Sequence, residues 1–136
     1  MILDLVNDLP ELYQPVFGHT ELSGHASRSS KDRLDLIVEC HDSLQHLLGR
    51  PLNVLDLGCA QGFLSLNLAS RGASVTGVDF LDKNIAVCEE LSRENPNLEV
   101  KFHCDSIEDI IESLKSNRYD LVLGLSVFHH IVYKQG

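Results

Sequence analysis

Residues 54–62, VLDLGCAQG, pass from apolar residues through an acid into a loop that contains two glycines. A short apolar run of this kind is typical of a buried strand, and glycine permits the tight turn that leads from a strand into a helix. Free amides and the dipole at the start of such a helix favour negative charge, and glycine lets a ligand come close to the backbone. Asp56 is unusual here because strands buried on both faces are mostly apolar. The stretch therefore predicts a ligand-binding loop in an α/β fold.

Strand and helix patterns alternate from residue 53 onward. We expect strands at 53–57, 74–79, 98–103 and 119–125, and helices at 63–71, at 82–95 and after Ser106. Ser106, with Asp109 three residues later, resembles a capping box. Repeated strand–helix units predict a parallel sheet with right-handed crossovers. The third strand alternates polar and apolar residues and is expected at a sheet edge, whereas residues 121–128 are almost entirely apolar, as in a strand covered on both faces.

The first 50 residues contain two helix patterns. A short amphipathic helix is expected before Pro10, and a longer one begins at Ser29 or Ser30 and ends at Gly49. Residues 11–30 lie between them and have no period, which predicts irregular structure with short turns. The residues expected on the buried face of the longer helix are Leu34, Ile37, Val38, His41, Leu44 and Leu48.

Composition and charge exclude several classes of protein. The 136 residues allow at most one domain, and the formal net charge of −9 argues against nucleic-acid binding, which relies on a basic surface. Four cysteines lie far apart without a CxxC pair, which predicts reduced thiols in the cytoplasm rather than a disulfide framework or a zinc site. The N-terminus is acidic and no apolar run is long enough for a bilayer, so we expect neither a secretory signal nor a membrane span.

Three acids follow or end the first three expected strands. Asp56 suits a ligand with a cationic end, and Asp79, about 20 residues after the loop, is placed to accept hydrogen bonds from ribose hydroxyls. Asp105 follows the third strand, where an acid can accept a hydrogen bond from an adenine amino group. A cationic amino-acid end, a ribose and an adenine together describe S-adenosylmethionine. The plainer alternatives are that Asp56 caps the helix after the loop and that Asp105 or Ser106 caps the next one.

A dinucleotide-dependent oxidoreductase is disfavoured, because the loop is not GxGxxG and Asp56 is foreign to that fingerprint. Residues 53–131 instead resemble class I S-adenosylmethionine-dependent methyltransferases. The motifs that carry the resemblance are VLDLGCAQG, VTGVDF, CDSIED and YDLVLGLSVFHH, with Ala60 in place of a glycine that is frequent in the family. The stretches LPELYQPVFGH, RLDLI, GRPLNVLDLGCAQGF and GLSVFHHIV resemble more narrowly the methyltransferase part of bifunctional kinase–methyltransferases that terminate polymannose O-antigen chains. This resemblance covers nearly the whole chain but only the front of such a protein.

The resemblance implies a Rossmann-like α/β fold with a parallel sheet in the order 3-2-1-4, later strands missing, and N-terminal helices. Residues 1–50 would form a helical cap segment and residues 51–136 a partial cofactor-binding domain. It also implies a pocket for S-adenosylmethionine and no metal. The cofactor-binding residues that it implies are Tyr13, Gln14, Arg33, Asp56, Gly58, Asp79, Phe80, Asn84, Asp105, Ser106, Ile107 and Leu125.

Several of these residues have plainer alternatives. Arg33 lies one turn into its expected helix and by default would be a solvated charge, and Tyr13 is equally consistent with a half-buried core aromatic. His129 and His130 are the only catalytic candidates, as a base or substrate anchor at a strand end. Adjacent residues on one element point in different directions, so a shared metal is not expected, and structural packing is favoured over a substrate role for either histidine.

The expected reaction is methyl transfer from S-adenosylmethionine to a phosphate on a polysaccharide or to another small acceptor. The alternative is a non-catalytic truncated remnant that at most binds the cofactor. The expected partners are a small-molecule or glycan-phosphate acceptor and no nucleic acid. The resemblance also implies a cytoplasmic location at the inner face of the membrane. There the chain would join a peripheral assembly with a glycan polymerase. Self-association is expected through the exposed strand edge at 121–125.

Overall fold

The computed structural model describes residues 1–12, 14–22, 27–114 and 119–124. Tyr13, Leu125, His129 and His130 lie outside the described residues, as does the end of the strand expected at 119–125. Among the described residues, no helix combines the length and the apolar character that a membrane crossing requires.

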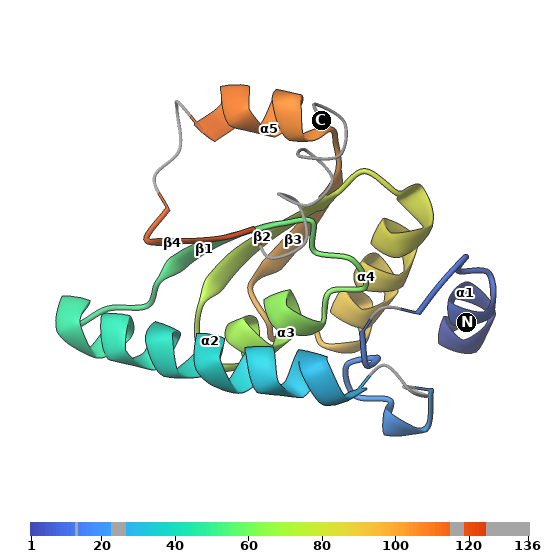
Figure 1. Ribbon diagram of the computed structural model, residues 1–136, viewed down its shortest axis with the longest axis horizontal. Coiled ribbons are helices and arrows are strands. Elements are labelled where there is room, and N and C mark those ends of the chain that lie inside the picture. Colours follow the sequence, from blue (N-terminus) through green and yellow to red (C-terminus); the bar gives the residue numbers. More distant parts are fainter. Residues whose placement is uncertain (13, 23–26, 115–118, 125–136) are drawn as a thin grey trace.

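Four parallel strands form one sheet (Figure 1). They lie in the order β3-β2-β1-β4, which confirms the predicted order and the Rossmann-like α/β class. The register places Asp56 beside Gly77 and Leu123, and Asp79 beside Cys104. The acids at the strand ends are therefore neighbours at one edge of the sheet. The strands are β1 (Asn53–Leu57), β2 (Ser74–Asp79), β3 (Val100–Cys104) and β4 (Leu121–Leu123).

Helices cover the two faces of the sheet unequally (Figure 1). Helices α2 (Ser27–Leu48), α3 (Phe63–Ser70) and α4 (Asp82–Glu94) pack against the face of Val54, Val75 and Phe102. Helix α5 (Ile107–Leu114) lies on the opposite face, where Ile110 packs with Leu55 and Val78. Helix α1 (Ile2–Asn7) lies beside α4, and a single 3-10 turn spans Thr20–Leu22.

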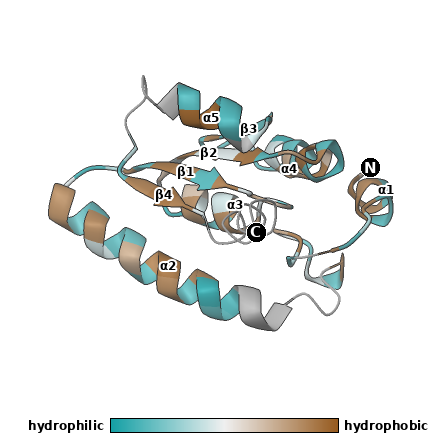
Figure 2. Cartoon of the chain, turned by 45° about the horizontal axis from the view of Figure 1, so that its top comes forward, coloured by the Kyte–Doolittle hydropathy of each residue, from teal (hydrophilic) through white to brown (hydrophobic). Residues whose placement is uncertain are grey.

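Helix α2 is amphipathic along most of its length, with apolar and polar stripes visible in Figure 2. Ile37 and His41 are buried as predicted, and Leu34, Val38 and Leu44 are partly buried. The prediction that Leu48 is buried is wrong, since 42% of this side chain is exposed. Leu48 is the last residue of α2, and the chain turns away at Gly49, whose φ is 68°, before the helix face meets the sheet again. The helix also begins at Ser27, earlier than expected.

The outer strands differ from their predictions in length and cover. Strand β3 begins at Val100 rather than at residue 98, and its alternation is confirmed by buried Phe102 between exposed Lys101 and His103. In β4, Leu123 is buried but 49% of Val122 is exposed, so the predicted cover on both faces is wrong at this position. The reason is that Ile110 of α5 packs over β1 and β2 rather than over β4.

An ion pair joins the starts of β1 and β4. Asp120 accepts hydrogen bonds from both terminal nitrogens of Arg50, at 2.8 and 2.7 Å, and from the backbone amide of Asn53 at 2.7 Å. These donors lower the pKa of Asp120 to about 2. This carboxylate, held by both a guanidinium and a backbone amide of β1, helps to set the register of β4 against β1.

Candidate functional site

The loop at residues 58–62 leads from β1 into α3 and has an unusual backbone. Gly58, Ala60 and Gly62 all have positive φ angles, of 72°, 50° and 84°. A left-handed conformation is uncommon for alanine, so Ala60 must be held there by its surroundings. A Cβ atom on Gly62 would lie 3.0 Å from the Cys88 sulfur, and its φ angle also favours glycine.

Asp79 holds this loop from the end of β2. Its Oδ2 atom accepts a hydrogen bond from the Ala60 amide at 2.9 Å, and its Oδ1 atom accepts from the Leu81 amide at 2.9 Å and from the Asn84 side chain at 3.3 Å. Asp79 therefore lies beside the loop, as the sequence predicts. Both of its oxygens accept hydrogen bonds from the chain's own donors, and these bonds fix the positive φ of Ala60.

Asp56 lies under the same loop and is buried. It accepts a hydrogen bond of 2.7 Å from the Ser65 hydroxyl. Burial raises the pKa of Asp56 to about 7, the Ser65 hydrogen bond opposes this rise, and the Asp79 charge adds to it. Helix α3 has Gly62 as its N-cap and no side-chain cap, so Asp56 does not cap it.

Asp56 and Asp79 are two buried acids that have no basic partner in the described part of the chain. Neither takes part in a salt bridge with a lysine, arginine or histidine of the described residues. Buried carboxylates are usually paired, because desolvation disfavours their charge. A ligand with a cationic end supplies the missing positive charge, so these residues fit a cation at the loop. Among the described residues, no cluster of acids, histidines and cysteines could hold a metal ion.

A buried network of side-chain amides joins the N-terminal segment to this site. The backbone amide of Gln14 donates to Oε1 of Gln61 at 3.1 Å, and Nε2 of Gln61 donates to Oδ1 of Asn84 at 2.7 Å. Oε1 of Gln14 accepts from the Phe63 amide at 3.1 Å, at the start of α3. Gln14 and Asn84 are predicted site residues, whereas only its place in the loop marks Gln61 in the sequence.

The remaining predicted site residues lie around the ends of the strands. The Asp105 amide donates to the Asp79 carbonyl at 3.1 Å, so the two residues are adjacent, but the Asp105 side chain is exposed. Ser106 begins α5 as the predicted capping residue: it accepts from the Asp109 amide at 3.3 Å and donates to the Asp109 carboxylate at 2.9 Å. Phe80 follows β2 and is 70% exposed.

Arg33 and Ile107 are less informative. Arg33 is exposed on α2, which agrees with its plainer alternative as a solvated charge. Ile107 is the first residue of α5, and only its backbone belongs to the described part. The structure thus brings together Gln14, Asp56, Gly58, Asp79 and Asn84, with Asp105 next to them.

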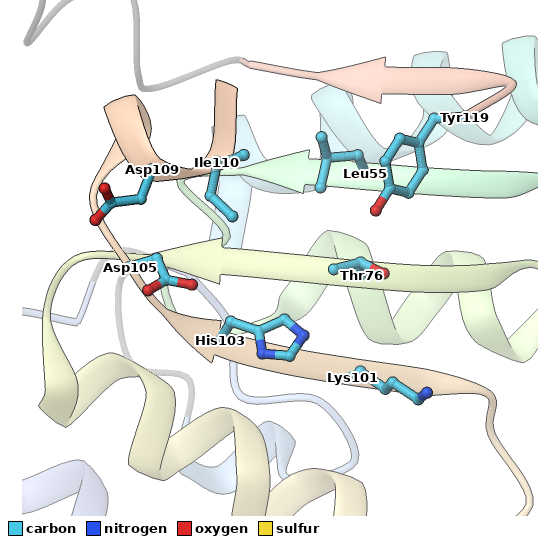
Figure 3. A pocket seen from close by; sticks show the side chains of 8 residues that line it. All are labelled: Leu55, Thr76, Lys101, His103, Asp105, Asp109, Ile110 and Tyr119. Atoms are coloured by element: carbon cyan, nitrogen blue, oxygen red, sulfur yellow. The ribbon is translucent and has the colours of Figure 1, made fainter. Parts of the chain in front are cut away.

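A pocket of about 400 Å³ lies on the other face of the sheet, below α5 (Figure 3). Asp105 and Asp109 lie at one end of it, and Lys101 and His103 project from β3. Leu55 and Thr76 form part of its floor, and these residues point away from the face that carries Asp56. The pocket is therefore separate from the space beside the ligand loop, and Asp105 borders both.

Residues 48–136 match a family described as "Methyltransferase domain". The O-antigen chain terminator bifunctional methyltransferase/kinase WbdD of Escherichia coli is 55% identical over 132 residues, which are 97% of this chain and 19% of that protein. A ubiquinone biosynthesis O-methyltransferase of Rickettsia canadensis is 34% identical over 100 residues, which are 73% of this chain and 40% of that protein. The chain thus spans about a fifth of the length of the WbdD proteins it matches.

Solved structures show the same relationship. A crystal structure of WbdD matches 100% of this chain and 31% of its own chain, with a TM-score of 0.95 and 54% identity. Magnesium protoporphyrin IX methyltransferase from Synechocystis, solved with bound SAM, matches 71% of this chain and 44% of its own, with a TM-score of 0.57 and 27% identity.

Proposed function

This chain belongs to the methyltransferase domain family, and we propose that it binds S-adenosylmethionine and transfers the methyl group to an oxygen of an anionic acceptor. The observation that carries the proposal is the pair of buried acids, Asp56 and Asp79, beside a loop with three positive φ angles and without a basic partner among the described residues. A positively charged nucleoside matches this site, because the acids can attract its positive charge and the glycines of the loop let it come close to the backbone.

Each acid has a proposed part in binding. Asp56 would attract the cationic amino-acid end, Asp79 would accept hydrogen bonds from the ribose, and Asp105 would accept one from the adenine amino group. Gly58 leaves room for the ligand beside the loop. The exposed Phe80 ring, directly after Asp79, would flank the adenine. Tyr13 and Gln14 of the N-terminal segment, together with Arg33, Asn84, Ser106, Ile107 and Leu125, complete the proposed binding set.

When bound, S-adenosylmethionine supplies an activated methyl group, which an acceptor oxygen takes in an in-line displacement that releases S-adenosylhomocysteine. The chain contributes alignment and exclusion of water rather than strong acid–base chemistry. The hydrogen bonds from Ala60, Leu81 and Asn84 hold Asp79 in place before the ligand arrives. A group held in advance loses little conformational freedom on binding.

A phosphate on a glycan is the proposed acceptor. The relative with 55% identity is an O-antigen chain terminator with methyltransferase and kinase activities, and a kinase supplies phosphate groups. A phosphate oxygen is already anionic near pH 7, so its methylation needs no general base. His129 and His130 remain the candidates for contacting the acceptor.

The surroundings of the reaction are also a proposal. We place it in the cytoplasm at the inner face of the membrane, in a peripheral assembly with the enzyme that polymerises the glycan. Self-association of the chain belongs to the same proposal. Its support is the likeness to an enzyme named as an O-antigen chain terminator.

Binding and transfer are tested separately. Calorimetry with S-adenosylmethionine should give saturable binding that is lost in Asp56→Ala combined with Asp79→Ala and kept in Glu108→Gln, a change of an exposed acid on α5. Methyl-labelled cofactor with phosphorylated mannosides should give a labelled phosphate ester. Binding that survives the double change would refute the assignment of the two acids. Binding without transfer would favour the non-catalytic alternative.

A further inference from the structure

Gln61 is fully buried within the ligand loop, although its side chain is polar. Its Oε1 atom accepts from the Gln14 amide at 3.1 Å, and its Nε2 atom donates to Oδ1 of Asn84 at 2.7 Å and, over a longer 3.5 Å, to the Glu11 carbonyl. These partners lie 47, 23 and 50 residues away in the sequence. One side chain therefore joins the N-terminal segment, the loop and α4.

The orientation of the whole network follows from one backbone amide. The amide of Gln14 can only donate, so the Gln61 oxygen must face it and the Gln61 NH2 group must face Asn84. Asn84 then presents its oxygen to Gln61 and its own NH2 group to Oδ1 of Asp79. Reversing either amide would bring two donors or two acceptors together. The positions of Glu11 and Gln14 are thus linked by hydrogen bonds to the carboxylate of Asp79.

A second contact strengthens the same link. Oε1 of Gln14 accepts from the Phe63 amide at 3.1 Å, which satisfies a free amide at the start of α3. The N-terminal segment therefore contacts the loop at Gln61 and the helix two residues further on. Losing one partner of a buried network leaves the other groups without hydrogen bonds, which costs more than a single exposed bond.

We infer that Gln61 is a positioning residue, which holds the segment 11–14 and Asp79 in one fixed arrangement around the cofactor site. This inference rests on the proposed function for its ligand, and it goes further by assigning cofactor affinity to a side chain that does not contact the reacting atoms. Gln61 acts before binding, by ordering the groups that the cofactor meets. Its loss should weaken cofactor binding and leave the rate of methyl transfer at saturating cofactor nearly unchanged.

Two variants separate the two sides of the link. Gln61→Met has a similar size and no hydrogen bonds, so it releases both the N-terminal segment and Asn84. Gln61→Glu keeps the acceptor for the backbone amide of Gln14 but lacks the donor for Asn84, so it releases the Asp79 side. On the N-terminal side it loses only the longer contact with the Glu11 carbonyl. Gln45→Met is the matched control: Gln45 is a partly buried residue of α2 whose Oε1 atom is buried without a hydrogen bond among the described residues.

The readouts are amide hydrogen exchange at residues 9–17 without ligand, the Kd for S-adenosylmethionine, and transfer at saturating cofactor. Gln61→Met should raise the exchange rate and the Kd by about tenfold each. Gln61→Glu should raise the Kd with nearly normal exchange, and Gln45→Met should change neither. Unchanged exchange in Gln61→Met, or a loss of transfer rate with an unchanged Kd, would overturn the inference. If the unaltered chain binds no S-adenosylmethionine, the proposed function fails, and the exchange measurement still decides whether Gln61 holds the segment.

Discussion

The carboxyl group of Asp56 combines burial, a single hydroxyl donor and a neighbouring acid, and its pKa rises from 3.8 to about 7. Because this pKa is higher in the folded than in the unfolded chain, the folded state carries an extra proton between about pH 4 and pH 7. The free energy of unfolding should therefore decrease as the pH rises through that range, by about 4 kcal/mol in total.

Asp56→Asn tests this directly, since the asparagine oxygen can still accept from Ser65. Urea unfolding of the variant should lose most of the pH dependence between pH 5 and pH 7 that the unaltered chain shows. Glu108→Gln on α5 should leave that dependence intact. Equal slopes for the unaltered chain and for Asp56→Asn would mean that Asp56 is ionised in the folded state throughout the range.

The raised pKa also predicts that ligand binding releases a proton. A cation that binds beside Asp56 favours its ionised form, so S-adenosylmethionine should displace a proton at about pH 6.5. Its affinity should then fall by up to about tenfold for each pH unit below 7. Calorimetry in phosphate and in Tris, which differ in ionisation enthalpy, measures the released proton.

S-Adenosylhomocysteine extends this measurement, because it keeps the ammonium group and lacks the sulfonium. Proton release with both ligands would mean that Asp56 faces the ammonium, and release with S-adenosylmethionine alone would point to the sulfonium. Binding heats that do not depend on the buffer in the unaltered chain would refute the prediction.

At the same scale, some site residues could be predicted from the sequence and others could not. Asp56 and Asp79 could be placed together because parallel strands bring their carboxyl ends to one edge. The orientation of Asp79 could not be predicted, since it depends on the Ala60 and Leu81 amides. Gln61 was missed because its partners come from distant segments, and no local pattern marks a buried amide network.

At the scale of elements, Gly77 of β2 packs closely against the side chains of Phe102 on β3 and Ser65 on α3. A Cβ atom there would lie 2.7 and 2.8 Å from two ring carbons of Phe102 and 3.0 Å from the Ser65 hydroxyl. The Phe102 ring is buried and cannot move freely. Gly77→Ala should therefore lower the free energy of unfolding by about 1–3 kcal/mol, as overpacking of a core does.

Urea unfolding measures this loss, with Ser74→Ala as the control on the same strand. Ser74 is exposed, so its change should stay within about 0.5 kcal/mol. Adding Phe102→Leu to Gly77→Ala should recover part of the stability, because it removes the atoms in conflict. A Gly77→Ala chain as stable as the Ser74→Ala control would show that the Phe102 ring and the Ser65 side chain can move aside without loss of stability.

Element types and strand order were predictable, whereas some element ends were not. Alternating strand and helix patterns with right-handed crossovers leave few arrangements, which is why the order β3-β2-β1-β4 was reached from the sequence. Leu48 continues the apolar period of α2 but is its last residue and is exposed, so periodicity alone predicted the wrong burial. The cover of Val122 depends on where α5 crosses the sheet, which the sequence of β4 does not contain.

At the scale of the whole molecule, the incomplete cover of the sheet and the net charge have opposite effects on association between chains. In the part of the chain that the structure describes, three helices pack on one face of the sheet and one on the other (Figure 1), and Val122 of β4 is left 49% exposed. Exposed apolar strand surface favours association between chains. The net charge of −9 opposes it, because copies of the chain repel one another.

The balance between these two effects predicts association that increases with salt. At about 0.5 M salt the repulsion is screened over a few ångströms, so sedimentation of the chain should show larger species than at low salt. Val122→Lys places a charge on the exposed strand face and should shift the chain toward the monomer. Leu47→Lys on α2, where the original side chain is 79% exposed, adds the same charge away from β4 and should change association less. Each lysine lowers the net negative charge by the same amount, so if both variants change association equally, the β4 face does not control it. A single monomeric species at every salt concentration would exclude association through this face.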